Sequence, residues 1–359
     1  MALLFAGIIP AGSVLAQQYE RSRSLTRSFP ASEETSVQII NKYGNIHVLP
    51  WDEDSIRFEI DIKVESSKES KVDKTYDNID IEFSESSYYL IAQTVFGNQK
   101  SAFWADVSDF TSSMLKSGSN AQIDYTVFIP EGVELSLELK FGNIYMTDHS
   151  GKTTVFISNG DFRGGSFTEL DLDHSFGNVL IESIENGTLT MAYSELHLKR
   201  AGDLRVSSKS SKPEIKSYSS LRINSKRDTW YLEKAGNLSG ETSFSYITIE
   251  SLDGDMILNT NYGNISVEGY GTNFNLMNLN SSYTDVSLIC SQNPGYSFEA
   301  YYDKKTRMIY PTQVKSFINK EVDSDNEEYL LSGHCGKSGE SKPRIKITTN
   351  GGSINLIQH

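Results

Sequence analysis

The hydrophobic pattern of this chain is a short phrase that repeats: an aromatic residue, then Gly-Asn, then alternating apolar residues. Between Phe141 and Tyr283 its copies recur about every 20 residues. This is the period of a β-solenoid coil rather than of a helical repeat. The clear copies begin at Tyr43, Phe141, Phe176 and Tyr262, and looser copies begin at Asn159, Tyr193, Tyr218, Phe244 and Tyr283.

Each clear copy changes the phase of its apolar residues at the Gly-Asn pair. Met256, Leu258 and Tyr262 share one parity, whereas Ile265 and Val267 are one step out of phase. A Gly-Asn pair takes positive φ readily, so a bend or bulge there keeps apolar residues inward on both sides. The pattern therefore predicts coil corners, with positive φ on glycine, at Gly44 and Asn45, Gly142 and Asn143, Gly177 and Asn178, and Gly263 and Asn264.

Between corners lie short apolar doublets and polar turns, which leave room for strands but not for a helix. We therefore expect an all-β protein, a single-stranded parallel β-helix (β-solenoid) with coils of about 17–26 residues. Coils that bury only a few aliphatic side chains need covers at both ends. The expected regions are a signal peptide at 1–16, a linker at 17–36, a β-rich N-terminal cap at 37–139, the solenoid core at 140–290, and a C-terminal excursion with a final, irregular coil at 291–359.

Three segments carry a resemblance to a known family. They are V-Q-I-I-N-K-Y-G-N-I-H-V-L-P-W-D-E-D-S-I-R-F-E-I from Val37, I-D-Y-T-V-F-I-P-E-G-V-E-L from Ile123, and P-R-I-K-I-T-T-N-G-G-S-I-N-L from Pro343. These segments resemble the putative adhesin family of exported bacterial proteins, whose head domains carry repeated G-x-I motifs on a β-solenoid. The resemblance implies a β-helix of the cell envelope or surface. It supplies no catalytic residues.

The N-terminal segment and the overall charge bear on location. An apolar run with small residues up to Ala16 is typical of a secretory signal peptide. Its usual positive start is missing, which leaves the true start codon open, and a buried or misassigned segment is the alternative. No later stretch approaches a membrane-spanning length. The formal charge of −14 argues against nucleic acid as a partner. We expect export to the periplasm, the outer-membrane surface or the medium.

A search for chemistry finds no catalytic or metal-binding motif, so no cofactor and no metal is expected. His174 falls on the inward parity and is interpreted as a core histidine. Asp171 and Asp173 alternate outward, as the carboxylates of glycan-cleaving β-helices do. A solvated strand explains the pair equally well. The charge-rich segments 65–75 and 321–328 are interpreted as solvated loops, and the second lacks the order of a calcium loop.

The repeated aromatic and Asn positions have two interpretations each. The aromatic residues could form an external platform for sugars, but their parity favours an internal ladder. The aligned Asn143, Asn178 and Asn264, with Asp161 and Asp285, could contact a ligand. We expect instead a side-chain ladder that binds backbone groups at the turns.

Two excursions interrupt the repeats. Residues 97–121 contain Phe103 and Trp104 and show helical spacing from 103 to 114, which suits either a packing element or a partner-binding loop. The second excursion, 291–342, contains Tyr301, Tyr302 and Tyr310. Cys290 and Cys335 bracket most of it and could form a disulfide in an oxidising compartment, or remain two separate thiols.

Exposed aromatic residues on irregular segments of a rigid scaffold are typical of binding sites. We therefore expect a non-catalytic envelope or surface protein that binds a glycan or a protein partner through Phe103, Trp104, Tyr301, Tyr302 and Tyr310. A glycan-active β-helix enzyme is the alternative. Clustered carboxylates with a basic residue on one face would favour the enzyme, whereas an uninterrupted Ser/Thr/Asn face would favour binding.

Overall fold

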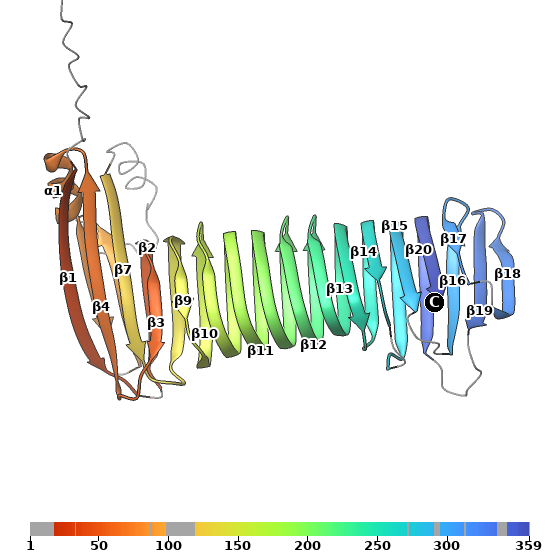
Figure 1. Ribbon diagram of the computed structural model, residues 1–359, viewed down its shortest axis with the longest axis horizontal. Coiled ribbons are helices and arrows are strands. Elements are labelled where there is room, and N and C mark those ends of the chain that lie inside the picture. The colour runs from red at the N-terminus through yellow and green to blue at the C-terminus, as the bar shows by residue number, and fades with distance from the viewer. Residues whose placement is uncertain are drawn as a thin grey trace, which may run out of the picture.

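The chain forms an elongated stack of rungs built on one long, open and mostly parallel β-sheet (Figure 1). This computed structural model describes residues 18–358 except 33, 87, 98–118, 271–272, 291–294, 312–313 and 336–342. The predicted all-β class with a solenoid-like arrangement is confirmed. The expected signal peptide, the helical spacing at 103–114, and both Phe103 and Trp104 lie outside the described residues.

The central rungs follow the chain in order. The strands are β8 (Glu134–Phe141), β9 (Ile144–Met146), β10 (His149–Ser158), β11 (Phe162–Lys209), β12 (Lys212–Lys226), β13 (Thr229–Leu252), β14 (Met256–Val267) and β15 (Leu276–Cys290). Parallel partners lie 17 residues apart at Leu204 and Leu221 and again at Leu221 and Leu238. The step widens to 21 residues only between Leu258 and Leu279. The repeat is therefore shorter and more regular than the sequence pattern suggested.

Positive φ falls on glycine at the first two predicted corners, Gly44 (105°) and Gly142 (139°), as expected, but on the residue before the glycine at the later two, which corrects the assignment there. Tyr262 has a φ of 53° and Phe176 one of 60°, whereas Gly263 is not in the left-handed region and Gly177 is near-extended at 158°. The glycine is required by close approach instead. A Cβ on Gly263 would lie 2.1 Å from the carbonyl oxygen of Ser245 on the preceding rung.

The aromatic ladder is external, which corrects the expectation that it faces the core. A left-handed residue reverses the alternation of a strand, so the side chain that parity would send inward leaves the stack. The rings stack face to face at 5.0–5.2 Å between centroids. They are about half exposed: Phe176 53%, Tyr193 50%, Phe244 48%, Tyr262 44% and Tyr283 46%.

Between Tyr193 and Phe244, two corners carry no aromatic residue. Ser210 and Arg227 have φ values of 53° and 59° and continue the 17-residue spacing between Tyr193 and Phe244. Tyr218, which the sequence pattern suggested as a corner, is a buried core residue at 6% exposure. One coil was therefore missed because neither corner residue is aromatic.

The core between the rungs consists of aligned Ile, Leu and Val side chains, with a few satisfied polar groups among them. His174 is fully buried, and its ring nitrogens lie 2.7 Å from Ser194 Oγ and 2.9 Å from the Gly160 carbonyl oxygen. The inward position predicted for His174 is confirmed. Burial lowers the pKa of His174, although the Gly160 carbonyl favours the protonated form.

The predicted Asn ladder is confirmed in the first rungs. Each side-chain oxygen accepts a hydrogen bond from the backbone N–H of the next rung. Asn143 N donates to Asn45 Oδ1 over 3.1 Å, Asp161 N to Asn143 Oδ1 over 2.9 Å, and Asn178 N to Asp161 Oδ1 over 2.9 Å. These bonds satisfy turn N–H groups that have no strand partner.

The N-terminal end is covered by antiparallel strands. They are β1 (Tyr19–Pro30), β4 (Ser55–Ser66), β5 (Ile79–Glu85), β6 (Tyr89–Phe96) and β7 (Ser119–Ile129), with β1 on β4 and β4 on β7. β2 (Ser36–Tyr43) and β3 (Ile46–Pro50) form the first rung and pair with β8 and β9. Part of the expected linker is therefore strand β1. Part of the expected loop at 65–75 is helix α1 (Glu69–Asp77), which buries Val72 and Thr75.

The C-terminal end departs from chain order. β20 (Arg344–Gln358) pairs with β15 on one side and with β16 (Tyr296–Asp303) on the other, both in parallel. β17 (Arg307–Ile309) also pairs with β20. β19 (Glu328–Cys335) and β18 (Lys315–Asp323) then extend the sheet in antiparallel fashion. The second excursion is thus the last part of the stack (Figure 1).

Candidate functional site

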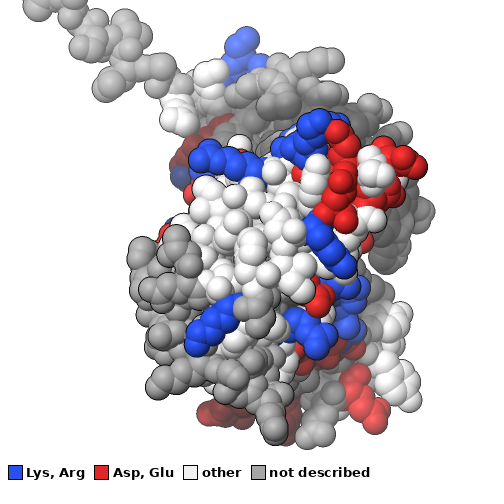
Figure 2. All heavy atoms as spheres, turned by 90° about the vertical axis from the view of Figure 1, so that its right-hand side faces the viewer, with Lys and Arg blue, Asp and Glu red and all other residues white. Residues whose placement is uncertain are grey.

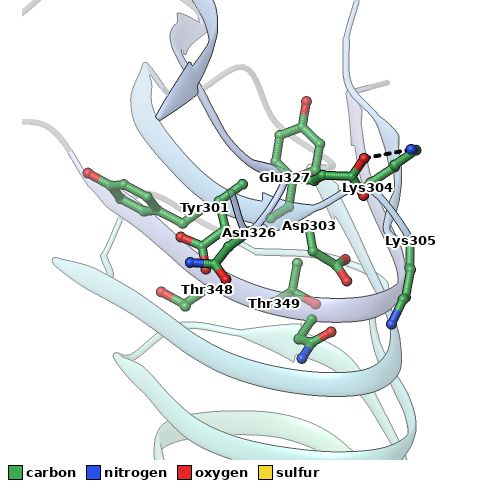
Figure 3. Close-up of a pocket in the computed structure, with 11 residues that line it drawn as sticks. Tyr301, Asp303, Lys304, Lys305, Asn326, Glu327, Thr348 and Thr349 are labelled. Atoms are coloured by element: carbon green, nitrogen blue, oxygen red, sulfur yellow. Dashed lines mark hydrogen bonds and ion pairs between the residues drawn. The ribbon is translucent and has the colours of Figure 1, made fainter. Parts of the chain in front are cut away.

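Two adjoining hollows form a polar trough near the C-terminal end. The first, of about 640 Å³, is lined by residues 301–305, 326–328 and 348–350 (Figure 3). The second, of about 670 Å³, shares Glu328 and 348–350 with the first and continues over 280–282, 259–261 and 241–243. We call the joined hollows the polar trough.

Strand register explains why the trough is polar along its length. One outward column has the order Glu241, Asn259, Asn280, Thr348 and Tyr301 on successive rungs. All five side chains are exposed. Adjacent rungs lie about 4.8 Å apart, so the column offers a hydrogen-bonding group at each such step.

A second outward column lies two residues further along each rung. It contains Ser243, Asn261, Ser282 and Asn350. Within the first column, Asn280 Nδ2 donates to Asn259 Oδ1 over 2.9 Å. The amides are thereby held in line while their remaining donors and acceptors stay open to solvent.

Tyr301 stands at the end of the first column, on one side of the trough (Figure 3). Its side chain is 39% exposed and projects from β16 opposite Thr348. Its neighbour Tyr302 points elsewhere. Tyr302 stacks on Tyr329 with 5.5 Å between ring centroids and donates from Oη to Asn319 Oδ1 over 3.2 Å. Tyr301 is therefore the aromatic side chain available to a ligand, and Tyr302 supports the wall.

The charged groups at this end of the trough are held by neighbours. Asp303 Oδ1 accepts hydrogen bonds from Thr306 Oγ1 over 2.7 Å and from the Gly351 N–H over 2.9 Å. Although partial burial works to raise the pKa of Asp303, these two bonds hold it below its usual range. Lys304 Nζ lies 2.7 Å from Glu327 Oε1, as the dashed line in Figure 3 marks.

A general acid for glycoside cleavage needs a raised pKa, and Asp303 has the opposite shift. The carboxylate of Glu327 is engaged by Lys304. Seen from the C-terminal end, side chains of both signs surround an uncharged central area (Figure 2). The arrangement suits neutral hydrogen bonding and stacking rather than acid–base chemistry.

The other sequence-predicted residues of the excursion divide between packing and undescribed positions. Tyr310 is 37% exposed and packs on Phe317, with ring centroids 5.2 Å apart, away from the trough lining. Cys290 and Cys335 end β15 and β19, but their side chains lie outside the described residues. The proposed disulfide therefore stays a prediction.

Asp171 lines a third hollow, of about 490 Å³, further toward the N-terminus. Its other charged residues are Glu169, Asp203, Arg205 and Arg222. Carboxylates and basic groups therefore do share one face here, as the enzyme alternative requires. Asp173 is exposed but is absent from the lining.

Sequence reasoning missed the Ser, Thr and Asn columns. Singly, these residues look like ordinary turn and strand positions. Only the strand register places them in line, with steps of 18 residues from Glu241 to Asn259, 21 to Asn280 and 68 to Thr348. In the described part of the chain, no group of three or more His, Cys, Asp or Glu side chains is arranged to hold a metal. Among the same residues, no helix has the length and apolar character needed to span a membrane.

Comparison with known proteins finds neighbours only among solved structures. No family model and no curated protein matches. A putative cell adhesion protein from Clostridium sporogenes is 10% identical, covers 94% of this chain and 100% of its own, and has a TM-score of 0.18. A putative adhesin from Bacteroides fragilis is 14% identical, with 68% and 96% coverage and a TM-score of 0.34.

A third neighbour carries a different name. A putative lipid binding protein from Parabacteroides distasonis is 12% identical, covers 74% of this chain and 92% of its own, and has a TM-score of 0.33. The adhesin names agree with the resemblance seen in the sequence. All three TM-scores lie below 0.5, so these neighbours do not indicate a function for this chain. The structural neighbours of this chain thus include proteins named as adhesins, at 10–14% identity.

Proposed function

We propose that this protein is an exported, non-catalytic binding protein of the cell envelope or surface, built as a single-stranded parallel β-helix, and that its polar trough binds a glycan chain. The observation that carries the proposal is the in-register column that runs from Glu241 to Thr348 and ends at the exposed ring of Tyr301. Hydroxyls and amides match the hydroxyl groups of sugars, and an exposed aromatic face packs against a sugar ring.

The form of the trough supports a chain rather than a small compact ligand. The two hollows join through Glu328 and 348–350 and together extend across β13, β14, β15, β20 and β16. At about 4.8 Å per rung, four steps between five rungs give a run of about 19 Å. Several sugar units can lie along such a run, with Tyr301 at its end.

The test is binding by Tyr301→Ala protein to a printed array of neutral and acidic oligosaccharides, followed by titration calorimetry with the best-bound oligosaccharide. We expect at least about a tenfold loss of affinity, in the range of a contact residue that contributes more than about 1.4 kcal/mol. Tyr301→Phe should keep most of the binding, because the ring face is retained.

The matched control is Tyr246→Ala, which removes a tyrosine that is 61% exposed and does not line the trough. It should bind like the parent protein. Equal binding by the parent, Tyr301→Ala and Tyr246→Ala proteins would refute the trough as the binding site.

The glycan-active enzyme is a second candidate, because Glu169, Asp171 and Asp203 line one hollow with Arg205 and Arg222. Its test is release of reducing ends from polysaccharides by the parent protein and by the Asp171→Asn, Asp173→Asn double variant. Cleavage that disappears in the double variant would establish the enzyme. We expect no cleavage by either protein.

A further inference from the structure

The chain as a whole is acidic, but residues 199–227 are strongly basic. The formal charge of the protein is −14, whereas this segment contains nine Lys and Arg residues and two Asp and Glu residues. The segment runs from the end of β11 through β12 to Arg227, in the middle of the stack, and none of its residues lines the polar trough. Its charge is therefore a local feature that requires its own explanation.

Four of these cations form a frame on one face of the sheet. Arg205 pairs in register with Arg222, and Lys209 with Lys226. The two rungs are about 4.8 Å apart, and four residues along a strand span about 13 Å. Alternation along the strand sends all four side chains outward, where they are exposed. We call these four residues the basic plate.

The interior of the basic plate is polar and uncharged. Ser207 and Asn224 lie in register between the two pairs of cations. The following rung presents Ser239 and Ser243 opposite Arg222 and Lys226. A ligand that neutralises the cations would therefore also meet hydroxyl and amide groups.

Nearby cations are already paired, but those of the basic plate are not. Glu182 lies 2.5 Å from Lys199 and 3.4 Å from Arg200, and Glu195 lies 2.6 Å from Lys212. Across the described residues, none of the ion pairs within 4.0 Å involves a member of the basic plate. Glu169, Asp171 and Asp203 share a hollow with Arg205 and Arg222, but none of them lies within ion-pair distance of a plate cation. The four like charges therefore repel one another, which an anionic ligand would relieve.

The aromatic ladder is interrupted beside these same rungs. Ser210 follows Lys209 and Arg227 follows Lys226, at corners where most other rungs carry Phe or Tyr. The guanidinium of Arg227 lies 6.0 Å from the ring centroid of Phe244. The interruption replaces an apolar edge by a hydroxyl and a fifth cation, so a chain crossing the plate meets no ring at this edge.

We propose that the basic plate binds an acidic polysaccharide, a chain of sugars that carry carboxylate or sulfate groups at intervals. The alternation of cations with hydroxyl and amide groups matches a polymer in which charged and neutral groups alternate. The plate adjoins the trough, because Glu241 and Ser243 lie on the rung next to Asn224 and Lys226, but its four cations do not line the trough, and the proposal does not depend on the trough binding a glycan.

The borders of the plate argue against nucleic acid. Asp203 lies two residues before Arg205, and Glu241 is in register with Asn224 on the next rung. Duplex DNA carries one negative charge per about 1.7 Å of axis, so it would place phosphates against these carboxylates. A sparsely charged sugar chain can place its anions on the cations and its hydroxyls elsewhere.

The experiment measures binding of a polygalacturonate oligomer, a chain of carboxylated sugars, by titration calorimetry at several salt concentrations. A neutral maltodextrin oligomer of the same length is the uncharged probe. With four cations engaged, log Kd should rise with log salt concentration with a slope of at most about 3, the value for a nucleic acid strand. In Lys209→Gln, Lys226→Gln protein the slope should fall by about half, and affinity at low salt should fall about tenfold.

The matched control is Lys216→Gln with Lys234→Gln, which removes two exposed lysines from β12 and β13 outside the plate and changes the net charge equally. It should bind polygalacturonate like the parent protein. Tyr301→Ala should also leave polygalacturonate binding unchanged. The trough proposal and the plate proposal can therefore be refuted independently of each other. Equal losses in the plate and control variants, or tighter binding of duplex DNA than of polygalacturonate, would overturn the proposal.

Discussion

Replacing Tyr262 by alanine should destabilise the protein far more than its exposure suggests. The ring is 44% exposed, and substitutions at such positions usually change stability by about 0.5 kcal/mol or less. Yet Tyr262 stacks on both sides, with ring centroids 5.0 Å from Phe244 and 5.2 Å from Tyr283 and 8° between each pair of planes. At about 0.5–1.5 kcal/mol for each aromatic pair, the loss should be about 1–3 kcal/mol.

Two further substitutions separate stacking from backbone strain. Among the described residues, Tyr193 stacks on one ring only, that of Phe176, so Tyr193→Ala should lower the free energy of unfolding by about half as much. Tyr262→Gly should cost no more than Tyr262→Ala. Removing the Cβ at a φ of 53° relieves about 1–2 kcal/mol, against about 0.5–1 kcal/mol of added backbone entropy loss.

The reverse substitution is also informative. Ser210 already has a left-handed φ of 53° beside Tyr193, so Ser210→Tyr should add one stacked pair and raise the free energy of unfolding by about 0.5–1.5 kcal/mol. The assay is equilibrium unfolding in urea followed by circular dichroism. Tyr246 is 61% exposed and serves as the control. If Tyr262→Ala lowers the free energy of unfolding no more than Tyr246→Ala does, the stacked rings do not contribute to stability as proposed.

Three other predictions follow from the corners, the core histidine and the cysteines. Gly177→Val and Gly263→Val should each lower the free energy of unfolding by more than about 1 kcal/mol in the same urea assay. The reason is that a Cβ at these positions would lie 2.2 Å and 2.1 Å, respectively, from a backbone oxygen of the preceding rung. Unchanged unfolding curves would contradict the close-approach explanation. Burial lowers the pKa of His174 below its ordinary 6.5, so the unfolded chain binds the proton more readily than the folded protein. The contribution of His174 to the free energy of unfolding should therefore be complete above about pH 6.5 and fall as the pH drops toward the folded-state pKa. His174→Asn should flatten that part of the profile, and an equally steep profile in the variant would contradict this origin. Protein exported to an oxidising compartment should show no free thiol at Cys290 or Cys335 on denaturing alkylation, and full labelling without reduction would exclude the disulfide.

The positions of the corners could be predicted from sequence, but their conformation only at Gly44 and Gly142, which have the expected positive φ. The Gly-Asn pairs do mark the turns, since parity changes there. Glycine is the usual left-handed residue, which predicts positive φ at Gly263. In the structure the positive φ is on Tyr262, and Gly263 is required by the close approach of the preceding rung. Because a left-handed residue reverses the in–out alternation of a strand, the sequence parity predicts an inward position for aromatic residues of the ladder that in fact point outward.

The candidate site could also be predicted only in part from the sequence. Tyr301 could be identified because an aromatic residue on an irregular segment stands out, and it does line the trough. The columns of Ser, Thr and Asn could not, because their meaning lies in a register that the sequence shows only through its spacing. That spacing is present in the sequence: Tyr193 and Phe244 are 51 residues apart, which is three coils of 17, whereas the aromatic pattern predicts a single corner between them, at Tyr218.

Because β20 lies between β15 and β16, the trough can form only after β20 has been synthesised. Residues 344–358 leave the ribosome after 296–335, yet they supply the rung on which β16 rests. Until they arrive, β15 presents an unpaired edge and Tyr301 has no Thr348 beside it. A nascent or prematurely ended chain therefore holds most of the stack but no recognition surface at this end, and its open edge is a site for wrong pairing with other chains.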